Sequence, residues 1–288
     1  MTDAVPGQDT RRVHFDQVIQ QIRDLPVLPA IAQDLMKPGE EDVDIHVITR
    51  KVSLDQALSA KTLRFANSSF YGLQSRVTTI QQAVTLIGVD AVRHVVTANA
   101  LTSYFPQYDC DGFSFIAQWR HSIATAVCAR VLARHLRVNQ EYAFTAGLLH
   151  DIGRLVLITH FRREYEAVIA YRETHDCEWL VAEQAVMGVD HVITGEALAM
   201  HWKFSETIRR AIAGHHNPEA QREHSLAAIV HVANSIVHAL DLSDQEDDVV
   251  PSITPSAWQG LGLDENVYRQ VFRETELLFE EVSRVLLT

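Results

Sequence analysis

The sequence predicts an all-α protein. Apolar residues recur at helical spacing along nearly the whole chain, and no pair of alternating apolar and polar segments indicates strands. With 288 residues, of which 47% are hydrophobic, the chain can bury a large core, either as one domain or as two lobes.

Helix starts can be placed from capping residues. Asn139 precedes QEYAFTAGLL, Ser205 precedes ETIRRAIAGHH and Asp264 precedes ENVYRQVFRETELLFEEV, and all three are residue types that cap helix N-termini. Glycines are expected at helix ends, at Gly72, Gly88 and Gly112. We therefore expect a dozen or more short helices.

The distribution of histidines and acids suggests two lobes and a C-terminal appendage. The first lobe covers residues 15–108, and the second, residues 113–240, holds 12 of the 15 histidines. An acidic and proline-containing linker, residues 241–256, begins with DLSDQEDD. It leads to a helical appendage at residues 257–288, which carries one apolar stripe: Val267, Val271, Leu278, Val282 and Leu286.

Bulk composition excludes several classes of function. The net charge is −12 and no basic stripe is present, so general nucleic-acid binding is not expected. No run approaches the roughly 18 uncharged apolar residues of a membrane span, and the first residues lack the apolar core of a signal peptide. The three cysteines are far apart and form no disulfide framework, which favours a cytoplasmic protein with reduced thiols.

The segment GLLHDIGRL, residues 147–155, places a His-Asp pair in an apolar stretch. On one helix, the side chains of His150 and Asp151 diverge by about 100°, so both serve one site only if it lies between their directions. A two-metal centre fits this arrangement, with the histidine on one ion and the carboxylate bridging both. Arg154, one turn further on, could hold a phosphate oxygen beside the metals.

A second adjacent pair, His215 and His216, follows the apolar-periodic TIRRAIAG. A buried imidazole at a helix end needs a partner, and either metal ligation or ordinary capping and hydrogen bonding would supply it. His121 and His191 also stand at the edges of apolar helices. Taken singly, they read as core or boundary histidines, as do two in AAIVHVANSIVHAL, His231 and His238.

Other chemistries find no support in the sequence. The phosphate-binding patterns GxxxxGK[ST] and GxGxxG are absent. So are the HExxH metalloprotease pattern and the GxSxG nucleophile pattern, and no cysteine lies in a reactive context.

Longer segments resemble a known family. LPVLPAIAQDLM (25–36), VITRKVSLDQALSAKTLRFANSSFYGL (47–73) and TIQQAVTLIGVDAVRHVVTANAL (79–101) are similar to the N-terminal half of the HDOD domain, an HD-related output domain of bacterial signalling proteins. AFTAGLLHDIGRLVL, GVDHVITGEALAMHWKFSETIRRAIAGHH and LAAIVHVANSIVHA continue the pattern in order, so the resemblance covers residues 15–240. It implies an all-helical, two-lobed fold.

The same resemblance implies a metal site. Positions that match the metal ligands of catalytic HD-GYP relatives are His121, His150, Asp151, His191, His215 and His216. Asn234 is expected as a further ligand, although it stands where the superfamily has a closing Asp. A second departure is Ala117, which stands where some relatives have a Glu that supports a third metal. With these mixed ligands, a dinuclear centre of Fe, Mn, Zn or Ni is expected in preference to Ca or Mg.

The resemblance leaves two functions open. The first is a signal-transduction output module that acts through interaction with a kinase, receiver or cyclase-type regulator. The alternative is a metal-dependent phosphohydrolase for a nucleotide or phosphoester, with Asp151 and Arg154 as catalytic residues. Cyclic di-GMP hydrolysis is not expected, because HHNPEAQREHS lacks the GYP motif and Arg154 replaces the usual Lys after HDIG.

Overall fold

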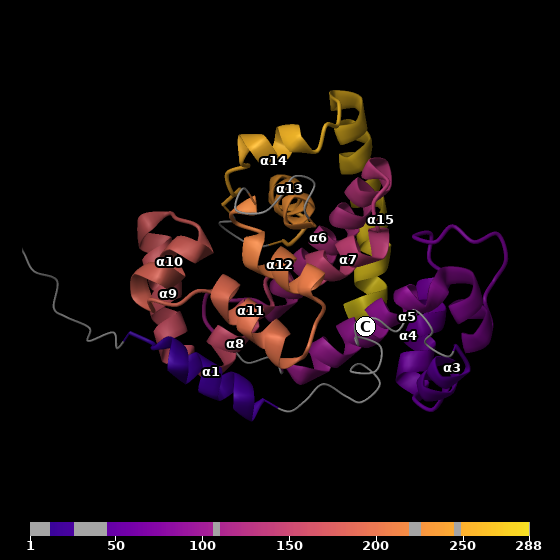
Figure 1. The fold of residues 1–288 in the computed structure, drawn as a ribbon, viewed down its shortest axis with the longest axis horizontal. Coiled ribbons are helices and arrows are strands. Elements are labelled where there is room, and N and C mark those ends of the chain that lie inside the picture. Colours follow the sequence, from indigo (N-terminus) through magenta and orange to yellow (C-terminus); the bar gives the residue numbers. More distant parts are fainter. Residues whose placement is uncertain (1–11, 26–44, 106–109, 219–225, 245–248, 288) are drawn as a thin grey trace, which may run out of the picture.

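The computed structural model describes residues 12–25, 45–105, 110–218, 226–244 and 249–287. The motif LPVLPAIAQDLM beyond Leu25 and the linker residues 245–248 lie outside the described residues. The described parts contain fourteen helices and no strand, only an isolated bridge between Cys110 and Phe113. The predicted all-α class is confirmed (Figure 1).

The helices follow one another closely along the chain. In order they are α1 (Phe15–Asp24), α3 (Ile45–Ser53), α4 (Gln56–Ala66), α5 (Ile80–Tyr104), α6 (Phe115–Leu136), α7 (Gln140–Leu149), α8 (Ile152–His160), α9 (Arg162–His175), α10 (Trp179–Val186), α11 (His191–His201), α12 (Glu206–Gly214), α13 (Leu226–Ala239), α14 (Pro255–Gly260) and α15 (Glu265–Leu287). Two of them, α6 and α15, exceed twenty residues without a break and are longer than the short helices expected from the sequence.

The predicted N-caps form the expected hydrogen bonds. The side chain of Asn139 accepts from two backbone N–H groups in the first turn of α7, and that of Ser205 accepts from one in α12. Asp264 accepts from the N–H of Val267 at the start of α15, 2.9 Å away. These caps were visible in the sequence because capping is a local interaction.

Helix α6 lies at the centre of the fold, against α7, α13 and α15. Most of its residues are buried, and many are alanines, which let neighbouring helices approach closely. It approaches α7 closely, since a Cβ added at Gly147 would lie 2.7 Å from the Cα of Ala126. This contact fixes the end of α7, where the His-Asp pair lies.

Helix α5 is kinked at Gly88, whose φ of +86° is in the left-handed region that favours glycine. The sequence predicted a helix end there, and two helical segments do meet at Gly88, where the backbone leaves the helical conformation. Among the described residues, α5 alone has the length and composition of a possible membrane span, but 56% of the window in question is buried. It packs on α3, α4 and α7, as a core helix does.

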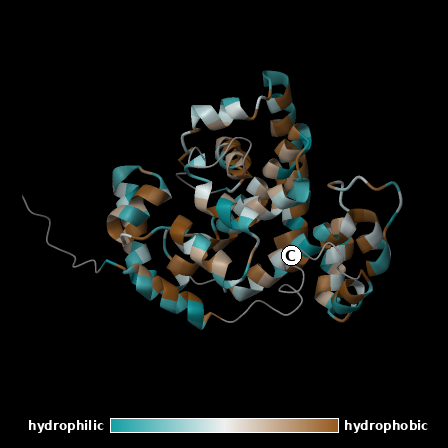
Figure 2. Cartoon of the chain, viewed as in Figure 1, coloured by the Kyte–Doolittle hydropathy of each residue, from teal (hydrophilic) through white to brown (hydrophobic). Residues whose placement is uncertain are grey.

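The two ends of the chain pack across the fold. Helix α1 lies in the expected first lobe, yet it packs on α8 and α11, and the N–H of Val13 donates to the carbonyl of Met187. Helix α15 packs along α6 and also contacts α4 and α5, and Val271, Val282 and Leu286 of its apolar stripe are buried. Figure 2 shows hydrophobic and hydrophilic residues interspersed along the helices. The division into two lobes at residue 108 stays a prediction.

Candidate metal centre

The His-Asp pair lies in the turn between α7 and α8 and not, as the sequence argument assumed, within one helix. His150 is the C-cap of α7, and Asp151 precedes the first residue of α8. Both side chains are buried, at 0% and 3% exposure. In this turn, the side chains of His150 and Asp151 both point into the protein interior.

Gly153 explains how this turn reaches the next helix. A Cβ at this position would overlap the carbonyl oxygen of His191 and the backbone nitrogen of Gly195, so only glycine permits the observed approach of α8 to α11. The approach places His191, the first residue of α11, beside the carboxylate of Asp151.

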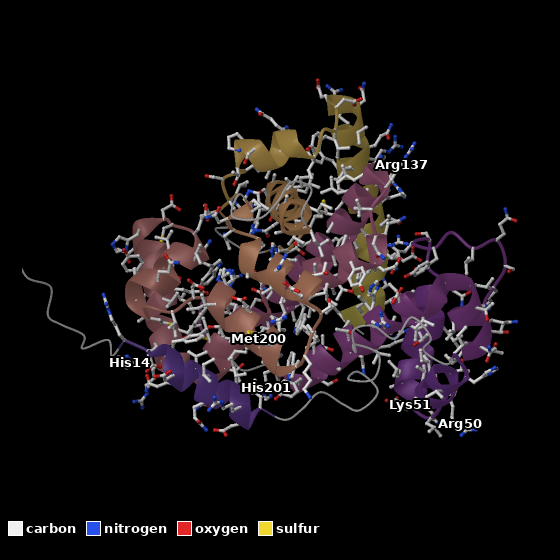
Figure 3. All side chains as sticks on the ribbon, in the orientation of Figure 1. His14, Arg50, Lys51, Arg137, Met200 and His201 are labelled. Carbon is white, nitrogen blue, oxygen red and sulfur yellow. The ribbon has the colours of Figure 1, made fainter. Side chains whose placement is uncertain are left out.

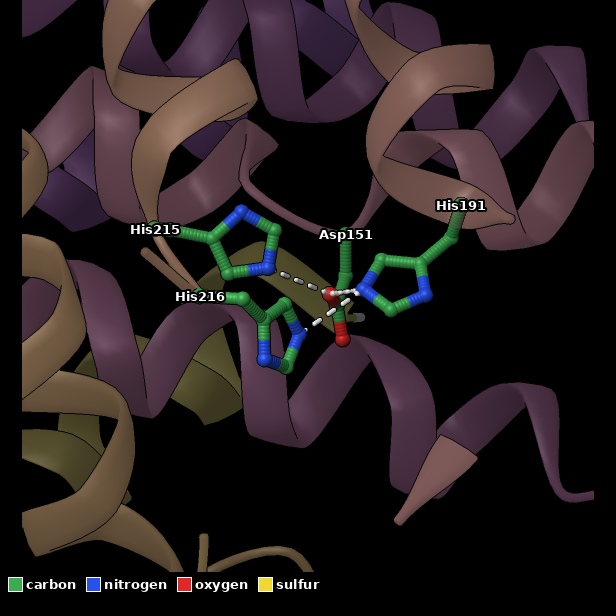
Figure 4. A group of neighbouring side chains, drawn as sticks. All are labelled: Asp151, His191, His215 and His216. Atoms are coloured by element: carbon green, nitrogen blue, oxygen red, sulfur yellow. Dashed lines mark hydrogen bonds and ion pairs between the residues drawn. The ribbon is translucent and has the colours of Figure 1, made fainter. Parts of the chain in front are cut away.

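Asp151 Oδ1 faces three histidines from α11 and the end of α12. It lies 3.3 Å from Nε2 of His191 and 3.5 Å from Nε2 of His215. Nε2 of His216 lies 3.1 Å from Nε2 of His191. Figure 4 shows the three imidazole rings gathered around the carboxylate of Asp151.

Asp151 Oδ2 faces the other two predicted ligands. It lies 3.6 Å from Nε2 of His150 and 4.0 Å from Nε2 of His121, and these two nitrogens are 3.3 Å apart. In each half of the cluster, the potential ligand atoms lie within 4.8 Å of one another. The structure thus brings all six residues together, and Asp151 belongs to both halves.

Hydrogen bonds fix the orientation of three of the rings. Nδ1 of His150 and Nδ1 of His215 each donate to the backbone carbonyl three residues earlier, at 2.7 Å. Nδ1 of His191 lies 2.6 Å from Oε2 of Glu183, a fully buried carboxylate of α10. With the proton held on Nδ1, the lone pair on Nε2 points to the centre, which is the usual arrangement of histidine ligands.

Burial keeps several of these rings neutral. It lowers the pKa of His150 to about 4, and it also lowers the pKa values of His121 and His216. For His191, burial lowers the pKa, but Glu183 and Asp151 outweigh it and raise the value above the ordinary one.

Asp151 itself is held as a carboxylate. Burial alone would raise its pKa, but Arg154, with His150 and His191, holds the pKa well below the usual range. The neutral rings of His121, His150 and His216 and the carboxylate of Asp151 all offer lone pairs. A transition-metal cation fits such a set of acceptors.

Arg154 is already bonded within the site. Its Nη1 lies 2.9 Å from Oδ2 of Asp151 and donates to Oε1 of Gln118 at 2.9 Å. Gln118 Nε2 is in turn 3.4 Å from Oδ2 of Asp151. The guanidinium predicted to hold a phosphate oxygen therefore also stabilises the carboxylate.

Asn234 lines the site without joining either ligand group. It is 5% exposed on α13 and borders a cavity of about 20 Å³ together with Asp151 and Arg154. Its Oδ1 has no hydrogen-bond partner among the described residues. Its role as a ligand stays a prediction, since an amide is a weaker ligand than the carboxylate expected at this position.

Sequence reasoning missed three residues of the site: Glu183, Gln118 and His238. The ring of His238 lies 4.5 Å from that of His121 and borders the same cavity as Asn234, one turn earlier on α13. Asn234 and His238 are four residues apart on one helix and therefore lie on the same face. This spacing could have indicated that His238 lies at the site. For Glu183 the signal was a charged residue on the apolar face of α10.

Other histidines support the fold. Nδ1 of His231 donates to the carbonyl of His215 at 2.7 Å, and its Nε2 accepts from the N–H of Thr254 at 3.0 Å. It therefore acts as the hydrogen-bonded core histidine that the sequence suggested. His14 and His201, to which the sequence assigned no role, lie at the start of α1 and the end of α11 (Figure 3).

Comparison with known proteins identifies the family. The model of the HDOD domain matches residues 25–218. The chain belongs to the HDOD domain family. The match is shorter at both ends than residues 15–240, the range expected from the sequence.

Solved structures share the fold. An HDOD domain protein of unknown function from Geobacter sulfurreducens is 23% identical, with a TM-score of 0.77 over 95% of this chain and 98% of that one. A proposed phosphohydrolase from Shewanella amazonensis is 25% identical, with a TM-score of 0.70 over 93% and 97%.

A curated relative from Treponema pallidum is uncharacterised. It is 25% identical over 229 residues, which cover 78% of this chain and 44% of the relative. The chain thus spans less than half the length of this relative.

Proposed function

We propose that this chain is a cytoplasmic signalling domain that binds metal ions and acts on a partner protein, in the manner of a regulatory output module. The expected partner is a kinase, receiver or cyclase-type regulator. Family membership supports the signalling context, and the buried His/Asp cluster supports the metal.

The enclosure of the cluster is the observation that carries this proposal. The cavity beside Asp151 and His216 measures about 20 Å³, which is room for about one water molecule. Bare ions fit between side chains in a space of this size, so the buried cluster is suited to holding ions.

The residues that would hold the ions come from several separate helices. His121 comes from α6, and His150 and Asp151 come from the turn that follows α7. His191 comes from the start of α11, and His215 and His216 follow the end of α12. Bound transition-metal ions would supply positive charge that links these helices. The free energy of metal binding would then add to the stability of the fold.

Elemental analysis of the purified chain and a matched pair of variants tests the proposal. His150→Ala removes a buried ligand, whereas His175→Ala removes the exposed histidine of the chain's other His-Asp pair. We expect bound Fe, Mn, Zn or Ni in the native chain, a lower content in His150→Ala and an unchanged content in His175→Ala. Circular dichroism should show both variants folded.

Two results would contradict the proposal. One is a full complement of metal in His150→Ala. The other is a native chain that binds none of the four metals after each is supplied to the metal-free protein.

The second candidate function is a metal-dependent phosphohydrolase. One observation favours it: two guanidinium groups, those of Arg154 and Arg172, border the cavity beside Asp151, and arginine pairs well with phosphate. In this reading Asp151 would be the catalytic carboxylate and Arg154 would orient the phosphate oxygens.

Activity assays separate the two candidates. We expect little or no hydrolysis of cyclic di-GMP or of a chromogenic phosphodiester by the native chain, even with added Mn or Fe. Rapid hydrolysis that depends on the metal and is abolished by Asp151→Ala would make this protein an enzyme.

A further inference from the structure

A short segment forms one wall of the small cavity at the metal centre. Val249 and Pro251 border this cavity together with Asp151 and Asn234. Residues 249–254, here called the strap, have no regular secondary structure and are all at least partly exposed, whereas Asp151 and Asn234 are buried. The strap therefore lies between the buried cluster and solvent.

His231 of α13 connects the strap to the centre. Its Nδ1 donates to the backbone carbonyl of His215, a predicted metal ligand, at 2.7 Å. With the proton on Nδ1, the lone pair on Nε2 accepts from the N–H of Thr254 at 3.0 Å, and the hydroxyl of Thr254 lies 3.1 Å from the same nitrogen. One imidazole in a single tautomer thus bonds both to a ligand residue and to the end of the strap.

A second hydrogen bond of the strap is weaker. The N–H of Ser252 donates to Oε1 of Glu178 at 3.4 Å, a long bond in an exposed position. Pro251 has no N–H to donate. Segments with few hydrogen bonds and much exposed surface open locally at low free-energy cost, while the helices around them stay folded.

The strap also lies beyond residue 218, where the match to the HDOD domain ends, so the family match does not account for it. We propose that the strap is a gate. With Thr254 bonded to His231 it closes the metal centre, and when this bond breaks, the centre opens to ions from solvent. The inference rests on the proposed metal-binding function and adds how ions enter and leave the site.

Thr254→Pro breaks the contact with His231 and leaves the bond between His231 and His215 in place. Residue 254 has a φ of −65°, the value that proline adopts, and its side chain makes no capping bond to α14. Its carbonyl, which accepts from the N–H of Trp258 at 3.1 Å, is kept. Ser252→Ala is the control within the strap, because it removes an exposed side-chain hydroxyl and keeps the backbone N–H.

The rate at which Zn²⁺ leaves the loaded chain for an excess of a chromogenic chelator measures the gate. Losing the two neutral bonds from Thr254 should raise the open fraction of the strap, and with it the release rate, by about tenfold in Thr254→Pro. The zinc content before the chelator is added should be unchanged. Ser252→Ala should release zinc at the native rate.

A readout without metal separates the gate from the proposed function. Asn234→Cys introduces a thiol at the cavity, and its alkylation in the metal-free protein, located by peptide mass, reports opening of the strap. Adding Thr254→Pro should speed this alkylation by about tenfold. The fully buried Cys128 should stay unmodified, which shows that the chain is folded. If Thr254→Pro exposes Cys128, Thr254→Val removes the hydroxyl alone and should give an increase of about threefold.

Equal rates of zinc release and of alkylation with and without the change at Thr254 would overturn the gate. If the native chain binds zinc, this result would leave the proposed metal-binding function intact. Faster alkylation in a chain that binds no metal would support the strap as the cover of the His/Asp cluster and contradict the proposed function.

Discussion

Glu183 permits a direct test of how the centre is held together. Its Oε2 lies 2.6 Å from Nδ1 of His191 and accepts from the backbone N–H of the same residue at 2.7 Å. Its Oε1 accepts from the hydroxyl of Tyr165 at 2.9 Å. Carboxylates that bond the far nitrogen of a histidine ligand fix its tautomer and raise its basicity.

Glu183→Gln keeps the size of the side chain and removes its charge. A hydrogen bond to a charged group contributes about 1.5–3 kcal/mol and a neutral one about 0.5–1.5 kcal/mol, so weakening the two bonds to His191 should cost about 2 kcal/mol. Metal affinity should fall by about tenfold to a hundredfold, the usual effect of losing such a partner. Tm should fall by several degrees.

The assay is a metal titration, with ¹⁵N NMR of the imidazoles to report the tautomer of His191. Tyr165→Phe removes only the bond to Oε1 and should have a smaller effect on affinity. Glu276→Gln, at an exposed position of α15, is the surface control and should have none. Unchanged metal affinity and an unchanged His191 tautomer in Glu183→Gln, whatever its Tm, would refute this positioning role.

Three further predictions follow from single positions. Asn234→Asp should raise the metal content measured by elemental analysis, because it restores a charged ligand; an unchanged content would place residue 234 outside the centre. Gly153→Ala should lose more than about 4 kcal/mol in urea unfolding or fail to fold, because its Cβ overlaps the backbone of His191, whereas Gly260→Ala meets no atom within 4 Å and should be tolerated. Burial lowers the pKa of His94 from 6.5 to about 3, so the neutral ring contributes stability above pH 6.5 that is lost as the pH falls toward 3. As the pH is lowered from 6 to 4, the urea unfolding midpoint of His94→Gln should therefore fall less steeply than that of the native chain. Parallel plots of the midpoint against pH for the two proteins would contradict this.

Local features of the fold and the site could be predicted from the sequence. Capping at Asn139 and Ser205 depends on residues within one turn, and both caps formed as expected. The adjacent pair His215 and His216 was visible for the same reason. The resemblance to the HDOD domain and its HD-GYP relatives then indicated which distant histidines come together. The structure brings them together around Asp151.

Features that depend on which helices meet could not be predicted. The apolar stripe of α15 showed that this helix packs on something, but not that it lies along α6. Glu183 lies on α10 and becomes part of the site only because α10 leads directly to His191. The His-Asp pair was placed within one helix because apolar periodicity runs through GLLHDIGRL, and periodicity does not reveal a turn between two successive helices.

Anomalous X-ray scattering from crystals of the purified protein tests the central claim most directly. The account predicts metal peaks beside Asp151, among His191, His215 and His216 on one side and His121 and His150 on the other, each at an absorption edge of Fe, Mn, Zn or Ni. Crystals grown with these metals that show no peak beside Asp151, or show peaks only at exposed histidines, would contradict it.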